Sequence, residues 1–193
     1  MIVASVTGDA AAPSPGAVQQ RYTRGAIWFH WTIATLIVAN LVIGIFQESF
    51  PRGSMGVHKA IGISVLFLSV ARLAWRLTHE RPPLATHLKR WEVLLAGLTH
   101  RAFYVLMIAV PLAGWLLVSA SPKRRPLTFF GLFDIPYLPV ARSAATDGLW
   151  QNAHEVLAFG ILGLLALHVA GALKHQLIDR DNELARMGVG RQG

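Results

Sequence analysis

Three stretches of the sequence, residues 26–46, 102–121 and 156–173, contain no charged residue and are about as long as a membrane-spanning helix. As an α-helix, the first would span roughly 30 Å, the thickness of the hydrocarbon core of a bilayer. A fourth apolar run, residues 60–71, extends to residue 77 if Arg72 and Arg76 direct their charges toward an interface. The sequence therefore predicts an all-α, integral membrane four-helix bundle, with spans at about 26–46, 57–77, 98–121 and 150–176.

The charge balance agrees with a membrane protein. Only 15% of the residues are charged, against about a quarter in a soluble domain. The net charge of +8 would indicate a nucleic-acid partner in a soluble protein, but in a membrane protein it is typical of basic cytoplasmic loops, and we expect no nucleic-acid partner. The loops on the side of both termini hold twice as many Lys and Arg residues as those on the other side, which predicts that both termini are cytoplasmic.

The ends of the chain lie outside the predicted bundle. Residues 1–20 are rich in Ala, Pro, Ser and Gly and lack the basic start and apolar core of a signal peptide, so we expect a disordered tail. The membrane domain is predicted at residues 21–187 and a short tail at 188–193. Pro111, inside the third span, is expected to kink that helix.

Cysteine is absent, which excludes disulfides, thiolate metal sites, iron–sulfur clusters and covalent haem attachment. A metal or cofactor must therefore be held by histidine, of which the chain has eight.

Four histidines fall within or at the ends of the predicted spans. His154 and His168 are 14 residues apart, so they share one helix face but are separated by roughly 21 Å along the axis. The predicted topology places His58 and His154 at one level and His30 and His168 at the other. Zinc would require three or four ligands per site, whereas two facing imidazoles suit the two axial positions of a haem. The alternative is that each histidine only forms interhelical hydrogen bonds.

Two further residues support this geometry. Gly44 follows His30 by 14 residues, and its missing side chain is expected to leave space for a flat macrocycle at the level of His58. Arg72 follows His58 by 14 residues and is predicted to reach the level of His30, where it could neutralise a haem propionate or instead extend to the interface.

Residues along all four spans resemble those of the bacterial cytochrome b561 family, and within it the di-haem superoxide oxidases. They are Tyr22, Arg24, His30 and Trp31; His58, Lys59, Arg72 and Arg76; His100, Tyr104, Pro111 and Gly114; His154, Glu155 and His168; and Asp181, Asn182, Leu184, Arg186 and Met187. The resemblance covers residues 21–187. It implies a multi-pass protein of the bacterial inner membrane that binds two non-covalent haem b groups through His30, His58, His154 and His168, oxidises superoxide and reduces ubiquinone.

The resemblance also favours a quinone site on the cytoplasmic side. The candidate residues, all potential hydrogen-bond donors, are His87, Lys89, Arg90 and His100, with Arg72 and Arg101 as further candidates. The alternative is that these bases only bind lipid phosphate.

On the opposite side, a positive patch could steer superoxide toward the outer haem. Its candidate residues are Arg52, Lys59, Lys123, Arg124 and Arg125. A charge run of this kind can also be an ordinary solvated surface, and only the resemblance favours the steering role.

Two other functions fit the same sequence. The chain could be a cytochrome b subunit that passes electrons between quinone and a peripheral dehydrogenase or hydrogenase partner. It could also be a channel or transporter whose histidines relay protons. A reduced-minus-oxidised absorbance spectrum separates the last of these from the redox functions.

Overall fold

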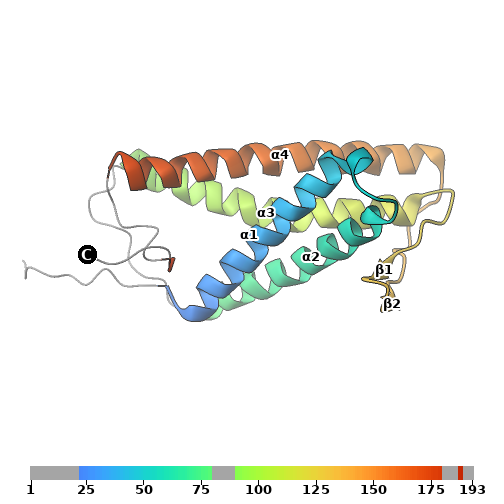
Figure 1. The fold of residues 1–193 in the computed structure, drawn as a ribbon, viewed down its shortest axis with the longest axis horizontal. Coiled ribbons are helices and arrows are strands. Elements are labelled where there is room, and N and C mark those ends of the chain that lie inside the picture. Colours follow the sequence, from blue (N-terminus) through green and yellow to red (C-terminus); the bar gives the residue numbers. More distant parts are fainter. Residues whose placement is uncertain (1–21, 80–89, 180–186, 189–193) are drawn as a thin grey trace, which may run out of the picture.

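Four long helices make up most of the protein in a computed structural model, which describes residues 22–79, 90–179 and 187–188 (Figure 1). They are α1 (Arg24–Ile45), α2 (Ser54–Thr78), α3 (Arg90–Ala120) and α4 (Ala144–Leu177). A 3₁₀ turn, η1 (Gln47–Ser49), follows α1, and two short strands, β1 (Thr128–Phe129) and β2 (Phe133–Asp134), lie between α3 and α4.

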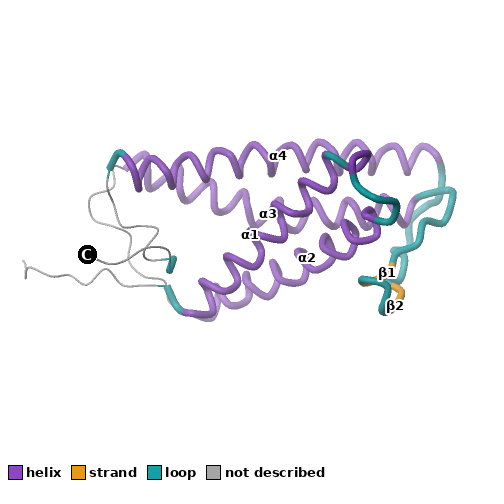
Figure 2. Tube along the Cα trace, in the orientation of Figure 1, coloured by secondary structure: helices purple, strands orange, loops and turns teal. Residues whose placement is uncertain are grey.

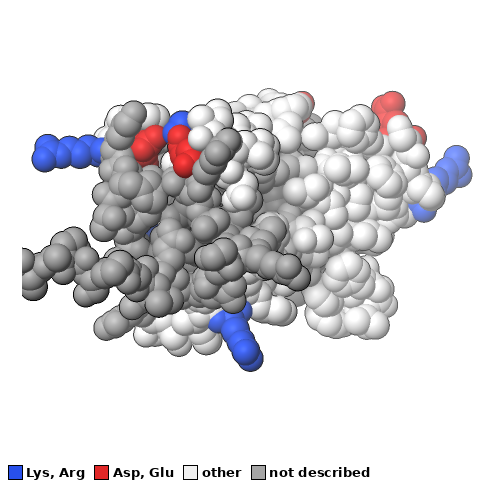
Figure 3. All heavy atoms as spheres, turned by 60° about the vertical axis from the view of Figure 1, so that its left-hand side comes forward, with Lys and Arg blue, Asp and Glu red and all other residues white. Residues whose placement is uncertain are grey.

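The helices run alternately up and down the bundle, so that the start of α1 and the end of α4 lie at the same end (Figure 2). All four are long and apolar enough to cross a membrane. In Figure 3 the charged side chains in view lie at the periphery of the molecule, and the described surface in the right half of the view is largely uncharged between them. The predicted four-helix membrane bundle is therefore confirmed. We call the two ends the termini end and the hairpin end, after the helix termini of α1 and α4 and the β1–β2 hairpin.

The helices begin at local sequence signals. The hydroxyl of Thr23 accepts a hydrogen bond from the Ala26 amide at the start of α1, and Ser143 does the same for Thr146 at the start of α4. The third and fourth helices begin earlier than the predicted spans because their first turns are polar and extend beyond the apolar runs. Helix α3 continues through Pro111, which is buried.

The helices pack as neighbours in the order of the chain. Helix α1 packs along α2, α2 along α3, and α3 most extensively along α4. Among the described helices, α4 packs closely against α3 alone. The main apolar core lies near the middle of the bundle and consists of Ile33, Ile37, Ile61, Val65, Met107 and Ile161. The packing of α4 against α1 and α2 is thus sparse compared with its packing against α3.

Sequence reasoning did not predict the hairpin at the end of α3. Strands β1 and β2 pair in antiparallel register, Thr128 opposite Asp134, with a tight turn in which Gly131 has a φ of 75°. The indole Nε1 of Trp115 donates to the Pro136 carbonyl at 2.9 Å, and Lys59 Nζ donates to the Pro126 carbonyl. These contacts attach the hairpin to α3 and α2.

Candidate functional site

The four span histidines form two facing pairs, one toward each end of the bundle. At the hairpin end, the ring centroids of His58 on α2 and His154 on α4 are 6.1 Å apart. At the termini end, those of His30 on α1 and His168 on α4 are 6.3 Å apart. We call these the hairpin-end pair and the termini-end pair. All four side chains are half-buried.

His58 is seated against a glycine of α1. Its Nδ1 donates to the Asn40 carbonyl at 3.1 Å. Gly44 lies one helical turn beyond Asn40 on the same face, and a Cβ at that position would come within 3.0 Å of His58 Cε1. Gly44 thus makes room for the histidine ring, and the space that it leaves for a macrocycle stays a prediction.

His154 is seated on α3 in the same way. Its Nδ1 donates to the Val110 carbonyl at 2.9 Å. Gly114 lies four residues after Val110, and a Cβ there would come within 3.1 Å of both Cε1 and Nδ1 of His154. Each hairpin-end histidine therefore rests on a carbonyl and a glycine spaced four residues apart. A donating Nδ1 leaves Nε2 with a lone pair available for a metal.

The termini-end histidines contact side chains of neighbouring helices, whereas the hairpin-end histidines contact backbone carbonyls and glycines. Nη2 of Arg72 lies 3.3 Å from Nδ1 of His30. The ring of His168 contacts the rings of His100, with centroids 5.7 Å apart, and of Phe103, 5.3 Å apart. The structure thus brings Arg72 to the level of His30, where the sequence predicts it.

Arg72 also selects the tautomer of His30. A guanidinium has donors and no acceptor, so Arg72 donates to Nδ1, and the ring proton of neutral His30 is then on Nε2. A metal bound at Nε2 would require that proton to be on Nδ1. For His30 to bind a metal through Nε2, Arg72 must therefore leave Nδ1 and donate to another acceptor. A haem propionate would be such an acceptor.

Both pairs fit a metal ion held between two imidazoles. Such an ion separates the ring centroids by roughly 6 Å, because each metal–nitrogen bond is about 2 Å and each centroid lies about 1 Å behind its nitrogen. The observed separations of 6.1 Å and 6.3 Å agree with this value. Each pair also bridges helices that do not pack closely on each other, α2 with α4 and α1 with α4. A flat cofactor between two such helices is compatible with both pairs.

Apolar residues separate the two pairs. Ile37 lies seven residues from both His30 and Gly44, and Ile161 lies seven residues from both His154 and His168. Both isoleucines are buried in the main core. The interior between the pairs is therefore apolar at these two positions.

The predicted quinone residues are only partly brought together. His87 and Lys89 lie outside the described residues. Arg90 and Arg101 are exposed on α3. His100, also on α3, is the candidate whose ring reaches the termini-end pair, and its Nδ1 donates to the Ala96 carbonyl at 2.7 Å. Its position suits a hydrogen-bonding role at that level.

The predicted superoxide residues all lie at the hairpin end, but three of them have structural partners. Lys59 is tied to Pro126, Arg125 is 3.8 Å from a carboxylate oxygen of Asp147, and the Arg124 guanidinium lies 4.9 Å from the centre of the Tyr137 ring. Arg52 and Lys123 are exposed. The patch is thus basic and partly engaged in holding the loop after α3.

Sequence reasoning missed several residues of the site. The carbonyl groups of Asn40 and Val110 hold the hairpin-end histidines, and Phe103 packs against His168. In the sequence, the two carbonyl positions are marked by the glycine that follows each by four residues, Gly44 and Gly114, whose helix faces are directed at a histidine of a neighbouring helix. No comparable sequence signal marks Phe103.

A family model described as prokaryotic cytochrome b561 matches residues 21–190. The chain belongs to the prokaryotic cytochrome b561 family. Members of this family are redox proteins that transfer electrons and bind haem b, and the four membrane-length helices agree with a bacterial membrane protein.

Several curated proteins are similar along nearly their whole length. "Cytochrome b561 homolog 2" of Escherichia coli K12 is 29% identical over 174 residues, which cover 87% of this chain and 91% of that protein. "Cytochrome b561 homolog 1" of the same organism is 28% identical over 86% of this chain and 96% of that protein. "Probable superoxide oxidase CybB" of Yersinia pestis is 26% identical over 91% of this chain and all of that protein.

Proposed function

We propose that this family member transfers electrons between the two sides of the bacterial inner membrane through two haem b groups. His58 and His154 would hold one haem, and His30 and His168 would hold the other. The observation that supports this most strongly is the presence of two histidine pairs, at opposite ends of the bundle, with the ring separation that a bis-histidine metal requires.

Haem b would supply reversible one-electron transfer between ferric and ferrous iron. The residues of the chain direct that chemistry. Two histidine ligands leave no open coordination position, which favours electron transfer over oxygen binding. The carbonyls of Asn40 and Val110 keep the hairpin-end rings in the Nδ1–H tautomer, and Ile37 and Ile161 belong to the apolar core between the two levels.

We further propose superoxide as the donor and ubiquinone as the acceptor. The overall reaction balances when two superoxide ions each lose one electron and become O₂, and one quinone takes up two electrons and two protons and becomes a quinol. The likeness to the Yersinia pestis protein supports this choice of substrates. The basic residues at the hairpin end would attract a small anion electrostatically and raise its rate of encounter with the site.

Quinone would bind at the termini end, which we propose to be cytoplasmic because basic residues are concentrated there. His100 is the candidate partner of the quinone head, since its ring lies beside His168. Because its Nδ1 donates to the Ala96 carbonyl, Nε2 of the neutral ring would accept a hydrogen bond from the quinol hydroxyl. His87, Lys89, Arg90 and Arg101 remain candidates on the same side.

A reduced-minus-oxidised spectrum of the purified protein, with a haem-to-protein ratio, tests the ligand assignment. We expect two haems per chain and the loss of one in His154→Ala, with the other retained. His175→Ala, which changes a histidine near the end of α4 outside both pairs, should retain two. Two haems in each of the four ligand variants would contradict the assignment.

Stopped-flow haem reduction tests the donor. Reduction by superoxide should slow as salt rises, because the Debye length falls from about 10 Å at 0.1 M to about 3 Å at 1 M. It should slow again in Lys123→Gln and Arg52→Gln, while reduction by a neutral donor is unchanged. A rate insensitive to salt and to both variants, or activity that requires a co-purifying subunit, would contradict the proposal.

A further inference from the structure

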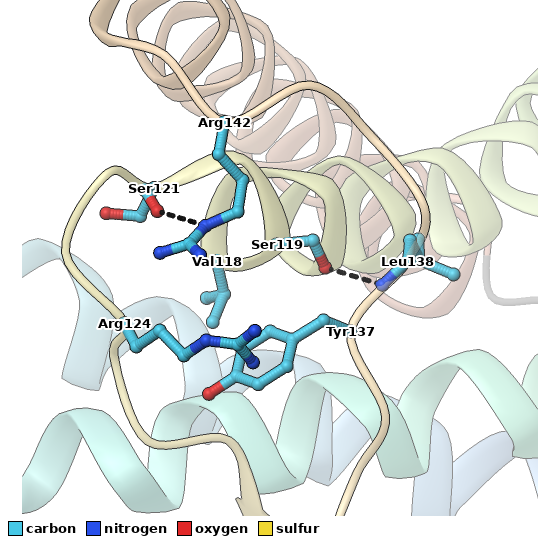
Figure 4. A pocket seen from close by; sticks show the side chains of 7 residues that line it. All are labelled: Val118, Ser119, Ser121, Arg124, Tyr137, Leu138 and Arg142. Carbon is cyan, nitrogen blue, oxygen red and sulfur yellow. Dashed lines mark hydrogen bonds between the residues drawn. The ribbon is translucent and has the colours of Figure 1, made fainter.

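A pocket of about 120 Å³, which we call the polar pocket after its two arginines and two serines, lies at the hairpin end, outside both histidine pairs. Figure 4 shows Arg124, from the loop after α3, and Arg142, from the segment before α4, entering it from two sides. No acidic side chain is among the described residues that line it. The pocket therefore combines two guanidinium groups without a neutralising carboxylate.

Both arginines are held in place. Arg142 donates through Nε to the Ser121 carbonyl at 3.2 Å and through Nη2 to the Pro122 carbonyl at 3.0 Å. The Arg124 guanidinium lies over the ring of Tyr137, whose hydroxyl donates to the Arg125 carbonyl at 2.9 Å. Guanidinium groups that are positioned in this way favour phosphate, which they bind through paired hydrogen bonds.

An apolar groove of about 350 Å³ continues from the same segment of chain. It is lined by Ile63 and Phe67 of α2, Trp115 of α3, Phe129, Phe133, Asp134 and Ile135 of the hairpin segment, and Pro136. Trp115 lies one helical turn from Ser119 of the polar pocket, and Pro136 of the groove directly precedes Tyr137 of the pocket. The polar pocket and the apolar groove are therefore neighbours.

The groove lies at membrane depth. Trp115 is roughly 8 Å before the end of α3, and Phe67 is roughly 20 Å beyond the start of α2, by helical rise. Phe67 and Phe133 are mostly exposed, at 63% and 58%, so the groove is open to its surroundings. A site with two cations at the helix ends and an apolar channel below them is complementary to an amphiphile with an anionic head.

We propose that this composite site binds one anionic phospholipid of the adjacent leaflet. The phosphate contacts Arg124 and Arg142, and an acyl chain lies in the groove between α2 and the hairpin. The two guanidinium groups favour an anionic head, because no carboxylate is among the described residues that line the polar pocket; Asp134 lines the groove. The lipid would fasten the hairpin to α2 and would occupy Arg124, which belongs to the basic patch described above.

Native mass spectrometry of the full-length protein, with phosphatidylglycerol and phosphatidylcholine of identical acyl chains, tests this proposal. We expect one retained phosphatidylglycerol, with affinity lowered roughly fivefold in Arg124→Gln, as for loss of one basic contact to an anionic lipid. Phe133→Asp, which places a charge in the groove, should lower the retention of both lipids. Arg52→Gln, an equal change of charge at the same end but outside the site, should leave both unchanged.

Three outcomes would overturn the proposal. Equal losses in Arg124→Gln and Arg52→Gln would show diffuse surface attraction. Unchanged retention in Phe133→Asp would show that the groove holds no acyl chain, and displacement of the lipid by excess ubiquinone would assign the groove to a quinone tail. Circular dichroism and gel filtration establish that each variant is folded, and binding is measured without any redox activity.

Discussion

Gly44 and Gly114 lack a Cβ and so allow the imidazole ring of a histidine on a neighbouring helix to pack against the backbone. Neither backbone freedom nor helix propensity explains glycine at these two positions. Each lies four residues after the carbonyl that accepts the histidine Nδ1–H, so the ring covers the glycine while it bonds to the carbonyl. Glycine in a helix costs about 1 kcal/mol relative to alanine. At these two positions that cost is offset by the close approach of a ring.

Replacement of Gly44 by alanine should therefore destabilise the hairpin-end site despite the gain in helix propensity. The added Cβ would approach His58 Cε1 to 3.0 Å, and overpacking of this kind typically costs about 1–3 kcal/mol. We expect a lower melting temperature and the loss of one haem signal. Gly163→Ala in α4, where a Cβ meets nothing within 4 Å, should be neutral or stabilising. Equal behaviour of the two variants would contradict the seating role.

At the scale of the elements, the termini end of the α3–α4 pair is joined by charge. Lys174 Nζ lies 3.0 Å from Glu92 Oε1 on α3 and 2.6 Å from Asp179 Oδ2, just beyond α4. The hydrogen bond from Lys174 lowers the pKa of Asp179 below its ordinary value. Asp179 also lies 2.9 Å from His175 Nδ1.

This cluster predicts a specific loss of stability in acid. Because the pKa of Asp179 is lower in the folded state, its ionised carboxylate contributes fully to the free energy of unfolding above the unfolded-state pKa of about 3.9. This contribution is lost as the pH falls through the folded-state pKa. Asp179→Asn should therefore cause a small drop in melting temperature at pH 7, and the drop should shrink as the pH falls below the unfolded pKa of about 3.9. Glu48→Gln, an exposed acid at the other end, should show no such pattern. A difference that persists in acid would contradict the ion-pair origin.

The hairpin and the loops could not be predicted from the sequence, in contrast to the helices. The helices were predictable because long charge-free runs have few alternatives in a membrane. Strands of two residues, such as β1 and β2, carry no periodic signal, and they exist because Leu127 and Ile135 are buried against Ile63 and Val118. Such contacts between distant segments cannot be seen in a local pattern.

At the scale of the whole molecule, the two histidine pairs are chemically unequal. The hairpin-end rings donate to carbonyl groups, which increases imidazole basicity and favours the oxidised metal. At the termini end, the guanidinium of Arg72 lies close to His30, and a positive charge that stays near this pair when Arg72 turns away from Nδ1 would favour a reduced metal. The proposed haems should therefore differ in reduction potential, with the higher value at the termini end.

Removal of this charge should reduce the difference. In a redox titration, Arg72→Leu should lower the midpoint of one centre by on the order of 60 mV, a tenfold change in a one-electron equilibrium, and leave the other unchanged. Arg76→Leu, whose guanidinium lies over the Tyr104 ring at 4.8 Å, should have a smaller effect. A parallel shift of both midpoints would contradict a local origin.

The arrangement of the site was only partly predictable. The 14-residue spacing of His154 and His168, together with alternating helix direction, predicts two histidine levels, and the structure has two facing pairs. The partners of the surrounding groups were not predictable, because a side chain's partner depends on tertiary distances. Lys59, for example, is conspicuous as a charge in the sequence but donates to the carbonyl of Pro126.

The separation of α4 from α1 and α2 bears on how the protein is made in the cell. If haem fills the space between those helices, it completes the bundle interior, and without haem α4 packs extensively on α3 and only sparsely on α1 and α2. Biogenesis would then include a checkpoint at which cofactor capture joins α4 to the rest of the bundle. Chains that miss this step would be substrates for membrane proteases, so that cofactor supply would set the abundance of the protein in the membrane.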